Sequence, residues 1–238
     1  RRHSCRRVLI CPISGDERDS DVGRCGREKI WTMDDHPTQD ERFSRAIELF
    51  DAANRKDPNV EMDNGKPWPK ELLYAQRMTE CLDCLAPEAC VAVRLAVRAQ
   101  HISRWQIPRT TYPKNREGYR RWRTELGNFH AETAGKILEE VGYDDQTIQR
   151  VQALLRKERL KVDPECQLLE DVVCVAFLKH YAVGFTQEHD EAKLINILRR
   201  TWHKMSPAGH QAALDLDLSS SLRALLNKAI DKPMEKSG

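Results

Sequence analysis

Two histidines and a pair of carboxylates are the side chains in this sequence best suited to chemistry. His101 and His130 lie in separate segments with helical periodicity, and Glu170 and Asp171 interrupt the most apolar stretch of the chain. A neutral imidazole can ligate a metal or act as a base, and an ionised carboxylate in apolar surroundings is costly unless it is paired or bound to metal. We therefore predict that His101, His130 and Asp171 hold a divalent metal. The alternative is that each of them has a separate structural partner.

A dense group of cations surrounds the first of these histidines. Residues 94–123 contain nine Lys and Arg but one acid, a net charge of +8, whereas the whole chain of 238 residues carries +2. Guanidinium groups bind phosphate in a bidentate manner, and aromatic rings stack on bases. We predict that this region binds an anionic small molecule or nucleotide, with RNA as a further candidate, through Arg98, Arg104, Trp105, Arg109, Arg120 and Arg121. Alternatively, carboxylates from elsewhere in the fold neutralise these cations.

The elements that must position these groups are all expected to be helices. From residue 39 onward apolar residues recur at helical spacing, as in Phe43, Ile47 and Phe50, and no window shows sustained alternation. We predict an all-α domain over residues 39–231, a tail over 232–238, and a disordered or non-native extension over 1–38, which shows no periodicity. The expected helices cover about 43–53, 72–82, 87–101, 116–141, 144–155, 164–177, 191–205, 207–214 and 219–230, and a turn-rich loop covers 57–68.

Composition excludes several classes of protein. Hydrophobic residues make up 40% of the chain and charged residues 32%, and the most apolar run, residues 172–178, is far shorter than the ~20 residues of a membrane-spanning helix. The eight cysteines show no disulfide framework, so we expect reduced thiols and a cytoplasmic protein, with an organelle as the alternative. The glycine-rich motifs of dinucleotide-binding proteins, P-loop NTPases and serine hydrolases do not occur in the sequence.

The segment from His130-Ala131 through Ile137-Leu138-Glu139 and Gly142-Tyr143-Asp144 to Asp171 resembles the second half of an HD-domain phosphohydrolase. This resemblance implies an all-helical HD-like fold in which His and Asp side chains hold metals that activate water on phosphoesters. Only His130 and Asp171 carry over directly, with His101 as a substitute ligand and Glu158 or Glu170 as the catalytic base. Elsewhere the sequence departs from the HD pattern, with Tyr74, Gln100-His101 and Lys157-Glu158 at positions where metal-binding residues are expected.

A second resemblance covers about residues 41–230. Phe43-Ser44-Arg45-Ala46-Ile47, Phe129-His130-Ala131-Glu132-Thr133 and Leu155-Arg156-Lys157-Glu158 are similar to domain of unknown function 4202, a helical family without an established reaction. Its members are often labelled glutamyl-tRNA synthetase, but no strand is expected before His101-Ile102-Ser103, and Lys204-Met205-Ser206 matches only part of the second synthetase motif. We therefore predict binding of a phosphorylated or nucleotide ligand, with metal-assisted hydrolysis as its enzymatic form. The competing prediction is a non-catalytic helical module that binds RNA or protein.

Overall fold

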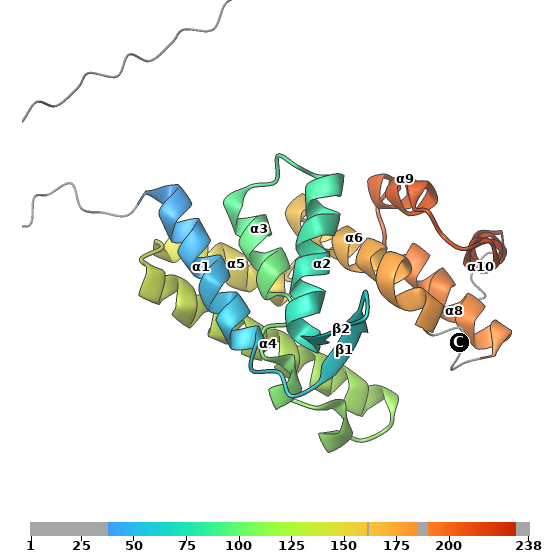
Figure 1. Cartoon of the computed structure of the whole chain (residues 1–238), viewed down its shortest axis with the longest axis horizontal. Coiled ribbons are helices and arrows are strands. Elements are labelled where there is room, and N and C mark those ends of the chain that lie inside the picture. Colours follow the sequence, from blue (N-terminus) through green and yellow to red (C-terminus); the bar gives the residue numbers. More distant parts are fainter. Residues whose placement is uncertain (1–37, 161, 185–189, 232–238) are drawn as a thin grey trace, which may run out of the picture. The chain divides into compact units, whose positions relative to one another are not determined.

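The computed structural model describes residues 38–160, 162–184 and 190–231. The predicted N-terminal extension and C-terminal tail lie outside these residues, apart from Thr38. The all-α prediction is confirmed, because the described chain is built from helices and a single small hairpin (Figure 1). None of the helices in these ranges is both long enough and apolar enough to cross a bilayer.

Most helix boundaries follow local signals in the sequence. Helix α4 ends where Gly142 adopts the left-handed conformation, with φ of 85°, and Asp144 caps the next helix by accepting a hydrogen bond from the N–H of Thr147. The α-helices are α1 (Gln39–Asn54), α2 (Lys70–Leu85), α3 (Val91–Ala99), α4 (Arg116–Val141), α5 (Asp145–Leu155), α6 (Pro164–Ala176), α8 (Glu191–Trp202), α9 (Pro207–Asp215) and α10 (Ser220–Ile230). The described residues also form two short 3-10 helices, η1 (Arg104–Gln106) and η2 (Arg109–Thr111), and a π-helix, η3 (Phe177–Tyr181). The expected start at Pro87 is wrong, since α3 begins at Val91.

The loop predicted over residues 57–68 is instead largely a β-hairpin. Strands β1 (Val60–Asp63) and β2 (Lys66–Pro69) pair in antiparallel register around Asn64 and Gly65. Both turn residues have positive φ, 48° and 74°, as an Asn-Gly hairpin turn requires. The strands escaped detection because each has four residues and because β1 turns Glu61 and Asp63, rather than apolar residues, towards the guanidinium of Arg77 on α2.

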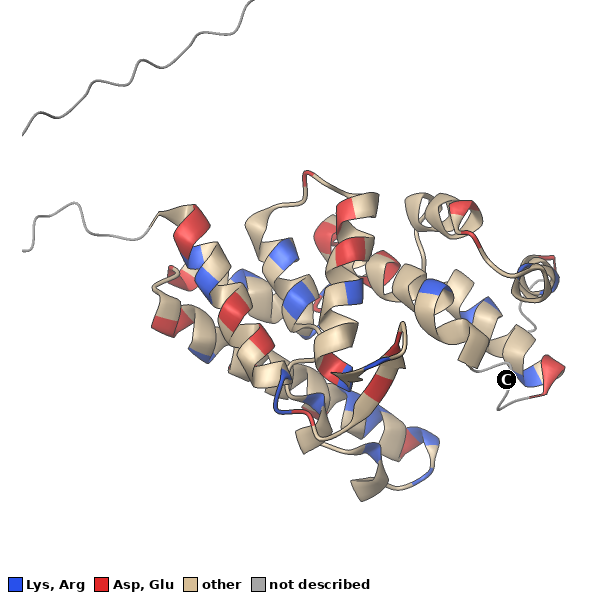
Figure 2. Ribbon diagram, in the orientation of Figure 1, with Lys and Arg blue, Asp and Glu red and all other residues tan. Residues whose placement is uncertain are grey.

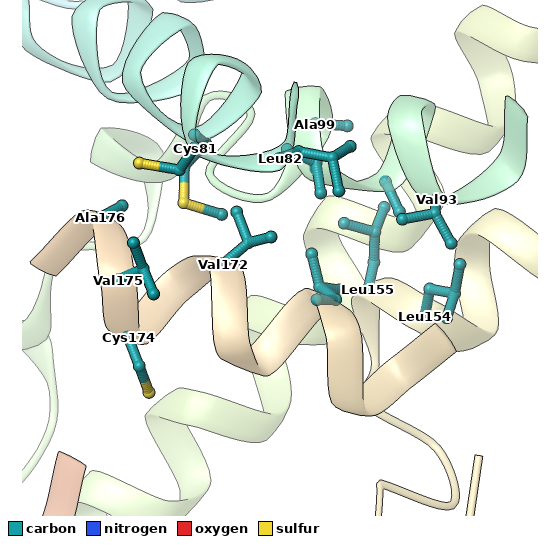
Figure 3. Close-up of a cluster of buried hydrophobic side chains, with 14 of the residues drawn as sticks. Cys81, Leu82, Val93, Ala99, Leu154, Leu155, Val172, Cys174, Val175 and Ala176 are labelled. Atoms are coloured by element: carbon teal, nitrogen blue, oxygen red, sulfur yellow. The ribbon is translucent and has the colours of Figure 1, made fainter. Parts of the chain in front are cut away.

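The hydrophobic core is centred on α6, as its apolar sequence predicted. In Figure 3, Val172 and Val175 of α6 face Cys81 and Leu82 of α2, and Leu154 of α5 lies near Val93 of α3. The same helix also contacts α9. Helix α6 therefore holds α2, α3, α5 and α9 in place around it.

Three helix segments that are distant in sequence meet beside this core. Helix α4 packs along α5 and α1, and α3 packs against α5. The turn after α3 is tied to α4, because the indole N–H of Trp122 donates to the carbonyl of Ile107 at 2.9 Å. This packing brings residues 100–104, the middle of α4 and the C-terminal end of α5 together.

Candidate functional site

A cavity of about 240 Å³ lies where α3, α4 and α5 converge. Four of its lining residues are cations, namely Arg104, Arg123, Arg156 and Lys157, and no described residue of its wall is an Asp or Glu. Figure 2 shows the wider distribution, with basic segments on α3 and along α4 and acidic segments on α1 and α2. The remaining lining residues are Gln100, His101, Thr124, Leu126, Gly127, Asn128, His130 and Leu155.

His130 is held in one tautomer on the wall of this cavity. The residue is 3% exposed, and its Nδ1 lies 2.8 Å from the carbonyl oxygen of Ile102, so Nδ1 must carry the proton and donate. Burial lowers the pKa of His130 to about 3, with Arg104 and Arg123 adding to the effect, and the ring is therefore neutral. Nε2 consequently bears a lone pair, and it has no hydrogen-bond partner in the described part of the chain.

His101 has both ring nitrogens occupied. Its Nδ1 lies 3.1 Å from Oε2 of Glu71 and its Nε2 lies 2.6 Å from a guanidinium nitrogen of Arg104, while the ring stacks on Tyr74 with centroids 3.9 Å apart. Burial and then Arg104 lower the pKa of His101 well below its ordinary value, so the neutral ring donates to Glu71 and accepts from Arg104. Burial also raises the pKa of Glu71 to about 7. His101 is therefore not open to a metal in this arrangement.

Asp171, the third predicted metal ligand, belongs to α6 and contacts the N-terminus of α9. It does not line the cavity. Its carboxylate accepts from the N–H of Ser206 at 2.8 Å, from the Ser206 hydroxyl at 2.6 Å and from the side-chain amide of Gln167 at 3.1 Å. Among residues 38–160, 162–184 and 190–231, no three His, Cys, Asp or Glu side chains are grouped as metal ligands. His101, His130 and Asp171 are not grouped in this arrangement of the described residues, and metal binding stays a prediction.

The two predicted catalytic carboxylates hold cations of the cavity instead of lining it. Glu170 is 4% exposed and forms an ion pair with Lys157, with the Lys204 ammonium 3.6 Å away. Burial alone would raise the pKa of Glu170, but these two ammonium groups bring it below its ordinary value. Glu158 accepts a hydrogen bond of 2.6 Å from Arg156. Both acids therefore form ion pairs with basic groups of the cavity wall.

The predicted phosphate-binding residues divide between several environments. Arg104 lines the cavity, and it also borders a neighbouring cavity of about 420 Å³ whose wall includes Trp105 and Arg109. Arg98 is buried in a bidentate pair with Asp51, with contacts of 2.8 and 2.7 Å, which corrects its assignment as a ligand contact. The exposed Arg121 pairs with Glu125 at 2.7 Å, and Arg120 lines neither cavity. The alternative of neutralisation within the fold thus holds for Arg98 and Arg121.

A comparison with sequence models of known families identifies the family of this chain. The model described as Domain of unknown function (DUF4202) matches residues 44–226, which is more than half of the chain and includes every residue that lines the cavity. The chain belongs to this family. No curated protein matches it, and no solved structure matches it either. The similarity to this family expected from the sequence motifs is therefore confirmed.

The cavity of this DUF4202 chain contains residues that sequence reasoning did not select. Arg123 is one of several arginines in the basic stretch, and nothing in the sequence distinguishes it from them. Arg156 and Lys157 lie about thirty residues further along the chain, where no local pattern connects them to that stretch. The HD resemblance gave one signal for two of the lining residues. Gln100 and Lys157 occupy positions at which the HD pattern expects metal-binding residues. Helix packing brings the cavity residues together, because the C-terminal ends of α3 and α5 both lie beside the middle of α4.

Proposed function

We propose that the cavity between α3, α4 and α5 binds a phosphorylated small molecule. One observation carries this proposal, namely that the four charged side chains on the described wall, Arg104, Arg123, Arg156 and Lys157, are all cations. Like charges that share a small, partly enclosed volume repel one another, and an anion between them removes the repulsion and accepts their hydrogen bonds. A dianionic phosphate group matches this arrangement better than a neutral ligand does.

The four cations differ in how much of their charge is already balanced. Glu170 and Glu158 pair with Lys157 and Arg156, whereas the Arg123 side chain makes no hydrogen bond or ion pair to any residue in the described ranges. The Arg123 side chain is exposed, yet its charge still lowers the pKa of both His101 and His130. Arg123 is therefore the cation that gains most from a bound anion.

The size of the cavity limits the ligand. A volume of about 240 Å³ lies below the ~300–1,000 Å³ usual for the pockets of drug-sized ligands. This space suits a phosphate group with a few carbon and oxygen atoms. A larger ligand, such as a nucleotide, would extend past Arg104 into the neighbouring cavity beside Trp105.

Isothermal titration calorimetry with inorganic phosphate, pyrophosphate and glycerol 3-phosphate tests the proposal. Loss of one charge-assisted contact costs about 1.5–3 kcal/mol, so Arg123→Gln should raise Kd by roughly 10- to 100-fold. Arg120→Gln is the matched control, because Arg120 lies on the same helix, is exposed and does not line the cavity. The proposal fails if none of the three probes binds the wild-type chain, or if both variants weaken binding equally.

A further inference from the structure

Two buried hydrogen-bond acceptors belong to residues of the cavity wall. Nε2 of His130 and Oε1 of Gln100 each lack a partner in the described part of the chain, and both residues line the cavity. A buried polar atom without a partner costs about 1–3 kcal/mol, so such atoms are uncommon in folded proteins. The two residues that carry these atoms both line a cavity that, as proposed above, receives a ligand.

The tautomer of His130 determines which kind of group can bind to its Nε2 atom. Because Nδ1 donates to the carbonyl of Ile102, which is itself buried, Nε2 can only accept a hydrogen bond or bind a cation. A metal cation is disfavoured here, since four cationic side chains line the cavity. The remaining partner is a hydrogen-bond donor, and no described side chain supplies one to Nε2. The commonest donor on a small phosphorylated molecule is a hydroxyl group.

We infer that the ligand of this cavity is a hydroxyl-bearing phosphomonoester, a sugar or polyol phosphate, whose phosphate contacts the cations and whose hydroxyl donates to Nε2 of His130. This inference rests on the proposed function and adds the substrate class. The cations surround the cavity from several segments, because Arg123 lies on α4 with His130 whereas Arg156 and Lys157 follow α5. Nε2 is covered from bulk water, so lining side chains adjust when the hydroxyl enters, as is common for side chains at binding sites.

A matched pair of probes tests the role of the hydroxyl. Glycerol 3-phosphate and propyl phosphate share the phosphate and the three-carbon chain, but propyl phosphate lacks the hydroxyl groups. One additional hydrogen bond contributes about 0.5–1.5 kcal/mol, so glycerol 3-phosphate should bind the wild-type chain roughly 2- to 10-fold more tightly. Inorganic phosphate serves as the probe for the cationic groups alone.

The variant His130→Asn isolates the acceptor atom. The amide N–H of Asn reaches the position of Nδ1 and keeps the donation to Ile102, while nothing replaces Nε2. We expect the preference for glycerol 3-phosphate over propyl phosphate to fall to about 1-fold, with affinity for inorganic phosphate unchanged within about 2-fold. Arg123→Gln should instead weaken all three probes and keep the preference.

Distinct outcomes overturn the inference and the proposed function. Equal binding of the two esters by the wild-type chain, or a preference that persists in His130→Asn, would show that the partner of Nε2 is a water molecule or another internal group. If none of the probes binds, the proposed function itself fails. Should His130→Asn not fold, ¹⁵N NMR of the wild-type imidazole decides, because the His130 Nε2 resonance must shift with glycerol 3-phosphate and remain in place with propyl phosphate.

Discussion

Replacement of Asp171 by Ala is expected to destabilise the fold and to leave phosphate binding intact. The carboxylate is 3% exposed, and it accepts hydrogen bonds from the N–H and hydroxyl of Ser206, the residue that caps α9. A hydrogen bond to a charged group contributes about 1.5–3 kcal/mol, and a carboxylate at a helix N-terminus adds about 0.3–1 kcal/mol. Water can reach the half-buried Ser206 in the variant, so we expect a net loss of about 3 kcal/mol in the free energy of unfolding.

Thermal and urea denaturation measure this loss. For a chain of this size 1 kcal/mol corresponds to about 2–4 °C, so Asp171→Ala should lower Tm by about 6–12 °C. Gly209→Ala probes the same contact, because a Cβ at residue 209 would lie 2.6 Å from Oδ1 of Asp171. Asp215→Ala is the control, since Asp215 is exposed and, among the described residues, its carboxylate accepts only from Gln211 one turn away. Its effect should stay within about 0.5 kcal/mol.

The double variant and the binding assay make this prediction refutable. Asp171→Ala combined with Gly209→Ala should cost less than the sum of the two single variants, because the first substitution removes the atom that the new methyl group meets. If Asp171→Ala keeps the wild-type Tm but abolishes phosphate binding, Asp171 acts at the ligand site. The structural role inferred from its contacts with Ser206 would then be refuted.

Three further predictions concern other charged residues. Arg98→Met should lower the free energy of unfolding by about 3 kcal/mol in urea denaturation, because it leaves the buried carboxylate of Asp51 unpaired, and the Kd for phosphate should not change. Lys157→Gly should be more stable than Lys157→Ala by about 1 kcal/mol in the same assay, since residue 157 has φ of 56° and both variants lose the ammonium equally. The Arg150 guanidinium lowers the pKa of Asp163 from 3.8 to about 2, so this pair stabilises the fold above pH 4 and the stabilisation is lost as pH falls from about 4 to 2. After screening by solvent the effect is about 1 kcal/mol, and the pH dependence of Tm over this range should become shallower in Asp163→Asn.

Helix boundaries could be predicted from the sequence because the signals that end a helix lie within a few residues of it. Asn115 and Asp144 cap their own helices, and Gly142 supplies the left-handed residue that stops α4. The β-hairpin, in contrast, could not be predicted from local signals alone. Its turn, Asn64-Gly65, is a local signal, but the inward-facing acids of β1 become intelligible only once Arg77 of α2 is seen beside them.

The sequence by itself determined which segments are helical and that cations gather between residues 94 and 123. Only the tertiary structure decided which charged side chains lie close enough to pair or to share a cavity. It brought Arg156 and Lys157 to the cavity, paired Arg98 with Asp51, and placed Asp171 beneath α9. The physical reason is that helix formation depends on neighbours along the chain, whereas the pairing of charges depends on distances in space, and helix packing sets those distances.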